Sequence, residues 1–404
     1  MKLNLVEPLM PDSADLEAKA TKVLAAANRI GRALHPDTIA AVVDLLQTVN
    51  CYYSNLIEGH DTHPIDIERA MRGEYSKGTQ ERHLQEEARA HIEVQREMEE
   101  RLHRESDLNP YSKEFLKWIH KEFYVRTPEE FRIVRNPDTG QTESVIPGEL
   151  RHYEVKVGRH IPPVYSELSG YLDRLSEAYD PLKHSPTKAM VALAAANHRI
   201  LWVHPFGDGN GRVTRLMTDA CLRRIDVSGY GLWNVSRGLA RRKREYLAAL
   251  EEADSPRWDN YDGRGALSLK ALESFCHFFL DICIDQLEYM SGLLHVDSLL
   301  ARVMAYGKAR QAGALPGASG KAGKTSAFRE EMTTLLEHLV LRGKVERSEV
   351  RKITGLEIRT ARRVVSALTE EGFVTSKTSR APLYLRIPAH AAPFLFPRLF
   401  NPPG

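Results

Sequence analysis

Apolar residues recur at intervals of three and four along most of the chain, which predicts a mostly α-helical protein. One of the clearest runs begins at Asp37 or Thr38 and continues to Gly59. Its apolar positions are Ile39, Val42, Val43, Leu46, Val49 and Tyr53. The same spacing predicts further helices over residues 13–34, 64–71, 80–104, 112–124, 164–179, 186–203, 213–222, 236–254 and 266–292. Helices therefore account for most of the first 300 residues.

The helical pattern breaks between Phe131 and Pro163. The stretch Asn136-Pro137-Asp138-Thr139-Gly140 has the residue types of a turn. Residues Tyr153 to Gly158 alternate between apolar and polar, which predicts a strand. We expect a small β-hairpin here, inserted between helices.

The last hundred residues have a pattern of their own. Residues 311–325 contain four glycines among small residues, which is typical of a flexible linker. A helix is predicted over 328–341, and helices over 348–353 and 357–371 flank a turn at Thr354-Gly355. Two short strands, 373–377 and 383–387, follow with Arg380 between them. This order resembles a winged helix-turn-helix domain.

Charge separates the same region from the rest of the chain. The net charge is only +2, but residues 301–404 carry 18 Lys and Arg against 8 Glu and no Asp. A basic terminal domain on an acidic body suggests DNA binding, with Arg359, Thr360, Arg362 and Arg363 as candidate contacts. Many winged helices instead bind proteins or dimerise, so a protein partner is the alternative.

Cysteine content and hydropathy predict the cellular compartment of the protein. The four cysteines, Cys51, Cys221, Cys276 and Cys283, lie apart on helical patterns, which favours buried free thiols in a reducing environment. No apolar run reaches the length of a membrane span, and no signal peptide is evident at the N-terminus. We expect a cytoplasmic protein without membrane contact.

The densest cluster of reactive side chains lies between the helices predicted over 186–203 and 213–222. It reads His204-Pro205-Phe206-Gly207-Asp208-Gly209-Asn210-Gly211-Arg212-Val213-Thr214-Arg215. Glycines let backbone amides approach a ligand, and a helix N-terminus favours phosphate. An imidazole can act as a general base, a carboxylate can bind phosphate-bound Mg²⁺, and arginines three apart share one helix face. An ordinary glycine-rich turn is the alternative, but this density of groups favours a phosphate site.

The same string resembles the signature of the Fic family, His-x-Phe-x-Asp/Glu-Gly-Asn-Gly-Arg-x-x-Arg, at every specified position. Members mostly transfer AMP from ATP to a hydroxyl side chain of a protein. The resemblance implies that His204 is the catalytic base and that Asp208 holds the metal. It also implies that one set of residues binds ATP, namely Gly207, Asp208, Gly209, Asn210, Gly211, Arg212 and Arg215. Kinase-like members carry Lys at the position of Gly211, so the chain resembles the AMP-transferring branch.

A second motif lies at the end of the helix that begins near Asp37. Ser54 and Glu58 are four residues apart and therefore share a helix face, and Gly59 suits a C-cap. Alone, this would be a polar stripe at a helix end. It resembles the family's inhibitory motif, Ser/Thr-x-x-x-Glu-Gly/Asn, whose Glu pairs with the second motif arginine, here Arg215. The resemblance implies autoinhibition, because an arginine neutralised by Glu58 cannot hold the γ-phosphate of ATP.

Two further features also resemble the family. Pro147-Gly148-Glu149-Leu150-Arg151 and the predicted hairpin match a Pro-Gly-x-x-Arg segment and a flap that holds an extended stretch of the target protein. Tyr246 is a candidate for contact with adenine, although a core tyrosine is an equally good interpretation. Relatives often have two tyrosines and an Asn where this chain has Tyr246-Leu247 and Asp254.

These features predict a mostly α protein in four parts. We expect an N-terminal helical region with the inhibitory helix over 1–109, a Fic-type helical core with a small β-hairpin flap over 110–310, a linker over 311–325 and a winged-helix domain over 326–404. The expected activity is transfer of AMP from ATP, with Mg²⁺, to a Ser, Thr or Tyr hydroxyl of a target protein, itself included. A homodimer is one arrangement that this organisation allows.

Two alternative functions stay open. The chain could be a DNA-binding transcription regulator whose core only senses nucleotide. It could also be a Fic enzyme that transfers another group, such as UMP or phosphocholine, or that removes AMP. The motif does not exclude transfer of another group, because its residues suit phosphates and not the base.

Overall fold

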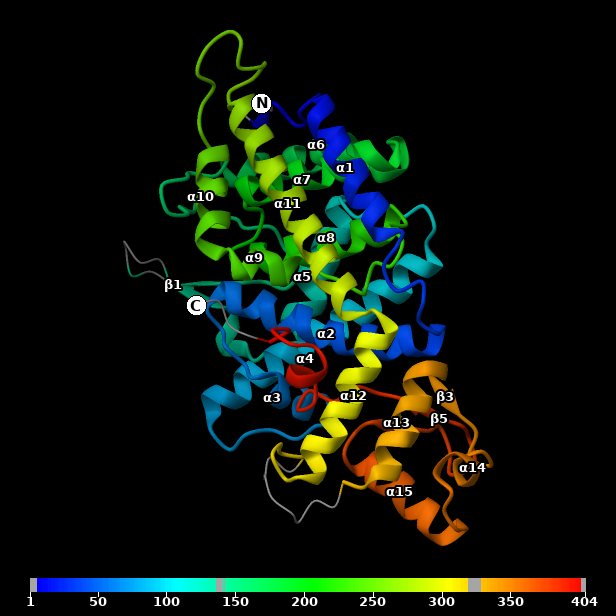
Figure 1. Ribbon diagram of the computed structural model, residues 1–404. Coiled ribbons are helices and arrows are strands. Elements are labelled where there is room, and N and C mark those ends of the chain that lie inside the picture. Colours follow the sequence, from blue (N-terminus) through cyan, green and yellow to red (C-terminus); the bar gives the residue numbers. More distant parts are fainter. Residues whose placement is uncertain (1–5, 136–139, 141, 319–327, 401–404) are drawn as a thin grey trace.

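The computed structural model describes residues 6–135, 140, 142–318 and 328–400, and this part of the chain is mostly helical (Figure 1). The first elements are α1 (Ala14–Ala27), α2 (Pro36–Glu58), α3 (Pro64–Met71), α4 (Thr79–Arg104) and α5 (Lys113–Arg126). The next are α6 (Leu168–Tyr179), α7 (Pro186–Val203), α8 (Asn210–Arg224), α9 (Val235–Arg241), α10 (Lys243–Ala253), α11 (Leu269–Leu293) and α12 (Val296–Gln311). The helices predicted over 64–71 and 186–203 are confirmed to the residue.

Helix α7 lies at the centre of the core. It is buried on nearly every side because its sequence is rich in alanine, which lets neighbouring helices approach closely. Helices α1, α6, α8 and α11 pack around it. Ser185 caps its start by accepting a hydrogen bond from the backbone N–H of Lys188. The candidate loop that follows α7 is therefore attached to a helix that is buried over most of its length.

Several predicted helix boundaries need correction. The helix predicted over 13–34 ends at Ala27, and the one predicted over 213–222 already begins at Asn210. The helix predicted over 236–254 is divided at Arg242 into α9 and α10. Helix α12 was not predicted. Helix ends depend on capping and tertiary contacts, which a periodicity of apolar residues does not report.

The hairpin exists, but its strands are not where the sequence pattern placed one. The pair is β1 (Ile133–Arg135) with β2 (Thr142–Ser144), antiparallel, with Ile133 opposite Ser144. The strand predicted over 153–158 is wrong, since that segment makes only an isolated bridge between Val157 and His160. The buried guanidinium of Arg151 explains this: it donates to the carbonyl oxygens of Tyr153 and Pro163 and draws the segment into a loop. The predicted turn at 136–139 lies outside the described residues.

The C-terminal region forms a separate group of elements. These are α13 (Glu330–Arg342), β3 (Lys344–Val345), α14 (Val350–Thr354), α15 (Ile358–Glu370), β4 (Val374–Thr375), β5 (Leu383–Leu385) and α16 (Ala392–Leu395). The strands form an antiparallel sheet in the order β3-β5-β4, in which β3 was not predicted. Gly355 separates α14 from α15 in the left-handed conformation, φ 68°, as a turn between two helices requires. Residues 319–325 of the predicted linker lie outside the described residues.

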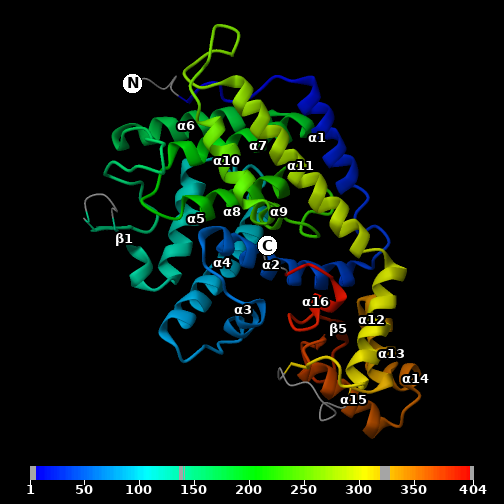
Figure 2. The same cartoon turned by 60° about the vertical axis from the view of Figure 1, so that its left-hand side comes forward.

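Helix α2 lies between the core and the C-terminal region, as both views show (Figures 1 and 2). Near its start, the Thr38 hydroxyl donates to the carbonyl of Val340 in α13 at 2.8 Å. Near its end, the Tyr53 hydroxyl donates to the carbonyl of Leu399 at 2.9 Å. The chain that follows α16 thus returns to the end of α2 that carries Ser54.

Two predictions about the whole chain can be compared with this structure. All four cysteines are free and buried. Within the described residues, no helix has both the length and the apolar character needed to span a membrane.

Candidate active site

The loop between α7 and α8 is compact and needs glycine at two positions. His204 ends α7 with φ 48°, and Gly209 precedes α8 with φ 78°, both in the left-handed region. A β-carbon at Gly209 would collide with the ring of Tyr124, and one at Gly207 would collide with the hydroxyl of Tyr153. The glycines therefore permit a turn that is tightly packed against two tyrosines.

Asn210 holds this loop together from the inside. Its Oδ1 accepts a hydrogen bond from the backbone N–H of Phe206 at 3.0 Å, and its Nδ2 donates to the carbonyl of Phe206 at 2.9 Å. The side chain is only 4% exposed. The first-turn amides of α8, at residues 210–212, have no acceptor within the helix and gather at its positive end. The Asn210 side chain therefore shapes the loop, while those backbone amides form a positive end that suits an anion.

Asp208 presents its carboxylate at the mouth of the loop. Its Oδ2 accepts a hydrogen bond from the Tyr124 hydroxyl at 2.7 Å and lies 3.9 Å from Arg212 Nη1. Nearly half of the side chain is exposed. The residues that the structure describes contain no cluster of three or more His, Cys, Asp or Glu suited to a metal ion. One partly exposed carboxylate beside a helix N-terminus fits Mg²⁺, which usually takes one or two carboxylates and completes its shell with phosphates and water.

His204 is fixed by its backbone. Its N–H donates to the carbonyl of Ile200, and its own carbonyl accepts from Nε of Arg151 at 2.9 Å. Burial, together with the positive charges of Arg151 and His160, lowers the pKa of His204 to about 4. The imidazole is therefore neutral at pH 7 and can accept a proton.

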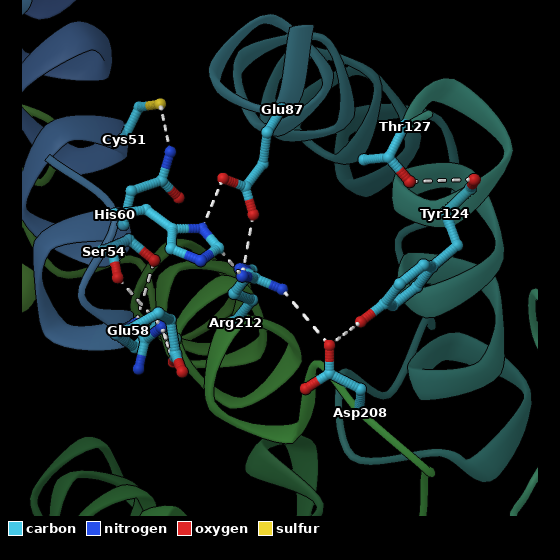
Figure 3. Close-up of polar contacts among 11 residues, drawn as sticks. Cys51, Ser54, Glu58, His60, Glu87, Tyr124, Thr127, Asp208 and Arg212 are labelled. Atoms are coloured by element: carbon cyan, nitrogen blue, oxygen red, sulfur yellow. Dashed lines mark hydrogen bonds and ion pairs between the residues drawn. The ribbon is translucent and has the colours of Figure 1, made fainter. Parts of the chain in front are cut away.

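Arg212 is held by a carboxylate that the sequence did not single out. Its Nη2 lies 2.7 Å from Oε1 of Glu87 in α4 (Figure 3). Its guanidinium also covers the ring of Phe123. The second oxygen of Glu87 lies 2.7 Å from Nδ1 of His60, just beyond the end of α2. Glu87 belongs to a helix dense in charged residues, so its sequence context gave no signal that distinguished it. Only the packing of α4 against α8 identifies it.

Arg215 contacts the end of α2, as the inhibitory motif predicts. Its Nη2 donates to Oε1 of Glu58 at 2.5 Å and to the carbonyl of Ser54 at 3.1 Å. Its Nε donates to Oγ of Ser54 at 2.9 Å. Burial alone would raise the pKa of Glu58, but the guanidinium groups of Arg215 and Arg212 outweigh it and lower that pKa. Glu58 is thus ionised at neutral pH.

The carboxylate of Glu58 also occupies space at the start of α8. A β-carbon on Gly211 would collide with Oε1 of Glu58, so this oxygen lies directly against the first turn of the helix. A negative charge at this place repels a phosphate group that approaches the same amides. The structure therefore brings together Ser54, Glu58, Gly211 and Arg215, although they come from distant parts of the sequence.

Tyr246 lies in the core beneath this cluster. Its side chain is only 2% exposed, its ring stacks against Phe278, and its hydroxyl donates to Oδ1 of Asn197 at 3.3 Å. The packing favours the core interpretation of this tyrosine. Its contact with adenine stays a prediction.

Comparisons of sequence agree with this site. A model of the Fic/DOC family matches residues 110–222. The protein adenylyltransferase Fic of Culex quinquefasciatus is 34% identical over 116 residues, which cover 28% of this chain and 22% of that protein. The protein of the same name from Drosophila melanogaster is 38% identical over 86 residues, which cover 21% of this chain and 17% of that protein. The match thus spans about a fifth of the length of these relatives.

Comparisons of structure extend further along the chain. A Fic family protein from Desulfovibrio desulfuricans G20 has a TM-score of 0.52 at 15% identity, covering 94% of this chain and 98% of that one. Fic-1 of C. elegans (residues 134–508) has a TM-score of 0.50 at 15% identity, covering 69% of this chain and 71% of that one. At these identities the likeness establishes the fold alone. The sequence match over the loop and its helices identifies residues 110–222 of this chain as a Fic/DOC family domain, distantly homologous to the protein adenylyltransferases named Fic.

Proposed function

We propose that this protein transfers AMP from ATP to a Ser, Thr or Tyr hydroxyl of a target protein, itself included, and that Glu58 holds it in an inactive state. The observation that supports this most directly is the contact of Glu58 with Arg215 beside the loop of His204. The relatives of this chain are named protein adenylyltransferases. The site combines a neutral base, a helix N-terminus for phosphate and an arginine that is engaged by an internal carboxylate.

The chemistry is a displacement at the α-phosphorus of ATP. Neutral His204 accepts the proton of the target hydroxyl, whose oxygen forms a bond to the α-phosphorus. The bond between the α-phosphorus and the bridging oxygen breaks, and pyrophosphate leaves with that electron pair. The amides at the start of α8 and the side chains of Arg212 and Arg215 hold the phosphates in line. Bound at Asp208, Mg²⁺ would supply charge neutralisation on the phosphates.

The resting state follows from the same geometry. Arg215 cannot hold the γ-phosphate while Glu58 and Ser54 accept its hydrogen bonds. The Glu58 carboxylate also lies against the first turn of α8, where it repels a phosphate. ATP that binds in this state therefore lacks the contact between its γ-phosphate and Arg215, and its α-phosphate is misplaced for attack.

The test compares the purified protein with its Glu58→Gly variant by intact mass after incubation with ATP and Mg²⁺. We expect the variant to gain AMP at least about tenfold faster, because a charge-assisted hydrogen bond contributes roughly 1.5–3 kcal/mol. Adding His204→Ala should then reduce transfer by about 100-fold or more, the usual size of general-base catalysis. Equal rates in the parent and Glu58→Gly would refute autoinhibition, and full activity in the double variant would refute the base.

The same measurement separates the alternatives. A protein that only senses nucleotide gains no mass in any variant. Incubation of Glu58→Gly with each nucleoside triphosphate in turn shows whether another group is transferred. Incubation of a modified protein without nucleotide shows whether AMP is removed.

A second function concerns the C-terminal region. We propose that its helices and three-stranded sheet form a winged helix-turn-helix that binds DNA. A groove of about 830 Å³ runs between α14, α15 and the loop from β4 to β5. Four arginines from both sides line it, namely Arg347, Arg351, Arg362 and Arg380. A backbone of phosphates matches a groove with positive charge on two walls.

Fluorescence anisotropy of a short labelled duplex tests this proposal. The affinity should fall steeply between about 50 and 200 mM salt, and Arg351→Ala or Arg362→Ala should each reduce the salt slope by about 1. Arg342→Ala is the control, because Arg342 is exposed on α13 outside the groove. A flat salt response would contradict DNA binding and favour a protein partner.

A further inference from the structure

The carboxylate of Glu87 is fully buried and takes no part in the proposed chemistry. A buried charge is costly unless it is paired, so its partners indicate what it does. Glu87 has two, one for each oxygen: Arg212 on α8 and His60 just beyond the end of α2. Figure 3 shows it between these two side chains, projecting from α4. Glu87 therefore connects Arg212 with the residues just after Glu58, in addition to a direct approach of Arg212 Nη2 to His60 Nδ1 at 3.4 Å.

The first contact controls the direction of a clamp residue. Arg212 is 5% exposed, and its guanidinium is bounded by Oε1 of Glu87, the face of the Phe123 ring and Oδ2 of Asp208. Of these contacts, the one to Glu87 at 2.7 Å is the close ion pair, since Asp208 lies at 3.9 Å. The N–H donors of arginine lie in one rigid plane. A partner that fixes one edge of the guanidinium therefore also fixes the direction of the other edge.

The second contact, between Glu87 and His60, fixes the position of the C-terminal end of α2. His60 lies two residues after Glu58, and its backbone N–H donates to the carbonyl of Asn55, which closes the last turn of α2. Because a carboxylate only accepts hydrogen bonds, Nδ1 of His60 donates to Oε2 of Glu87 at 2.7 Å. Movement of Glu58 away from Arg215 would strain this bond. Residues 54–60, which we call the inhibitory turn, are thus held to α8 by Glu58 and to α4 by His60.

We propose that Glu87 is a positioning residue with two tasks: it presents Arg212 to the phosphates of ATP with one carboxylate oxygen, and it anchors the inhibitory turn through His60 with the other. This inference rests on the proposed function. The two tasks have opposite effects on transfer, because presentation of Arg212 promotes it and anchorage of the turn restrains it. A pair of backgrounds, with and without Glu58, separates the tasks.

The first arm of the experiment uses the Glu58→Gly background, where the inhibitory carboxylate is gone. Glu87→Gln should raise the KM for ATP by about 10- to 100-fold, the usual cost of a displaced binding group, with a smaller change in kcat. Glu87→Asp keeps the charge and should restore part of the affinity. Calorimetric titration with Mg-ATP in the Glu58→Gly/His204→Ala background, where no turnover is expected, should give the same loss as a Kd.

The second arm uses the parent protein. His60→Ala should raise transfer of AMP to the protein itself by about three- to tenfold, the equivalent of one lost hydrogen bond. In the Glu58→Gly background the same substitution should add nothing further. A rise of equal size in both backgrounds would contradict anchorage of the inhibitory turn.

The matched control is Glu99→Gln. Glu99 lies on the same helix as Glu87 and pairs with Arg223 at 2.7 Å, further along α8 from the loop. It joins the same two helices without contact to the motif. If Glu87→Gln and Glu99→Gln change KM and Kd equally, Glu87 is only a tie between helices and the inference fails.

The outcomes also separate this inference from the proposed function. If Glu58→Gly transfers no AMP, the proposed function fails, yet the Kd for Mg-ATP still decides whether Glu87 presents Arg212. If Glu58→Gly is active and Glu87→Gln leaves both KM and Kd unchanged, the inference alone fails. Thermal melting of each variant shows which are folded. If Glu87→Gln does not fold, the first arm uses Glu87→Asp, whose shorter side chain should give a smaller rise in KM and Kd in the same direction, and no rise would contradict the inference.

Discussion

A histidine can act as a base only while its imidazole is neutral, and the surroundings of His204 keep it so well below pH 7. Burial and the positive charges of Arg151 and His160 lower its pKa to about 4. An unperturbed histidine would lose half of its neutral form at about pH 6.5. We therefore expect kcat/KM of the Glu58→Gly variant to show no loss near pH 6.5 and to fall only as the pH approaches 4.

Initial rates between pH 7.5 and 4.5 test this expectation, each checked by returning a sample to pH 7.5 to exclude unfolding. A loss of activity centred near pH 6.5 that is recovered on return would contradict a buried neutral base. His103, which is exposed on α4, is the control position, since His103→Gln should leave the profile unchanged.

The site residues that could be predicted from the sequence lie close together along the chain. His204, Asp208 and Arg215 occur within one loop and the helix turn after it, so their residue types and spacing predicted a common site. Glu87 could not be found this way, because one Glu among the many charges of α4 has no distinguishing spacing. Its importance depends on the contact between α4 and α8, which arises only when the chain has folded.

Helix α2 links two parts of the molecule, so its contacts with the C-terminal region should affect the active site. The Tyr53 hydroxyl donates to the carbonyl of Leu399, and Tyr53 immediately precedes Ser54. We expect Tyr53→Phe to loosen the inhibitory end of α2 at a cost of about 1 kcal/mol, the net value of a hydrogen bond. Transfer of AMP to the protein itself should then rise about fivefold, measured by intact mass.

Thr38→Val provides the comparison. It removes a hydrogen bond of the same kind, to the carbonyl of Val340, at the opposite end of α2. Both variants should lower the melting temperature, but only Tyr53→Phe should raise the rate. Equal rates in the two variants would show that the C-terminal contacts stabilise α2 without influence on Glu58.

At the scale of elements, most helices and the strands β4 and β5 were predicted, whereas helix α12 and the hairpin strands β1 and β2 were not. The periodicity over 186–203 identified α7 to the residue, because an amphipathic or apolar helix leaves a long signal. The alternation over 153–158 suggested a strand, but the buried guanidinium of Arg151 binds the carbonyls there and no ladder forms. Strand pairing depends on distant partners, which a short stretch of sequence does not contain.

For the molecule as a whole, the sequence match covers a much shorter part of the chain than the structural match does. The Fic/DOC family model covers residues 110–222, whereas the likeness to the Desulfovibrio desulfuricans protein covers 94% of the chain. The likeness in fold therefore extends well beyond the residues that the family model matches. The position of α2 between the core and the C-terminal region belongs to this level, and no local pattern indicated it.

Three buried histidines and the partly buried His204 should make the whole fold sensitive to acid. Burial is the largest cause in each case, and it lowers the pKa of His91 to about 3 and those of His120, His198 and His204 to about 4. In the unfolded chain the same groups bind a proton near pH 6.5. Between pH 6.5 and 4 the unfolded state therefore binds more protons than the folded state, so stability rises with pH across this window.

The contribution of these groups is fully present above pH 6.5 and is lost as the pH falls toward 4. Since a pKa difference of one unit corresponds to about 1.4 kcal/mol, the sum of these contributions is comparable to the roughly 5–15 kcal/mol that stabilises a typical folded domain. Urea unfolding at a series of pH values should show a steep fall in the free energy of unfolding below pH 6.5. His120→Gln should flatten the fall, because a glutamine can still accept from the backbone N–H of Gly148 and does not titrate. A free energy of unfolding that stays constant down to pH 5 would contradict the lowered pKa values of these four side chains.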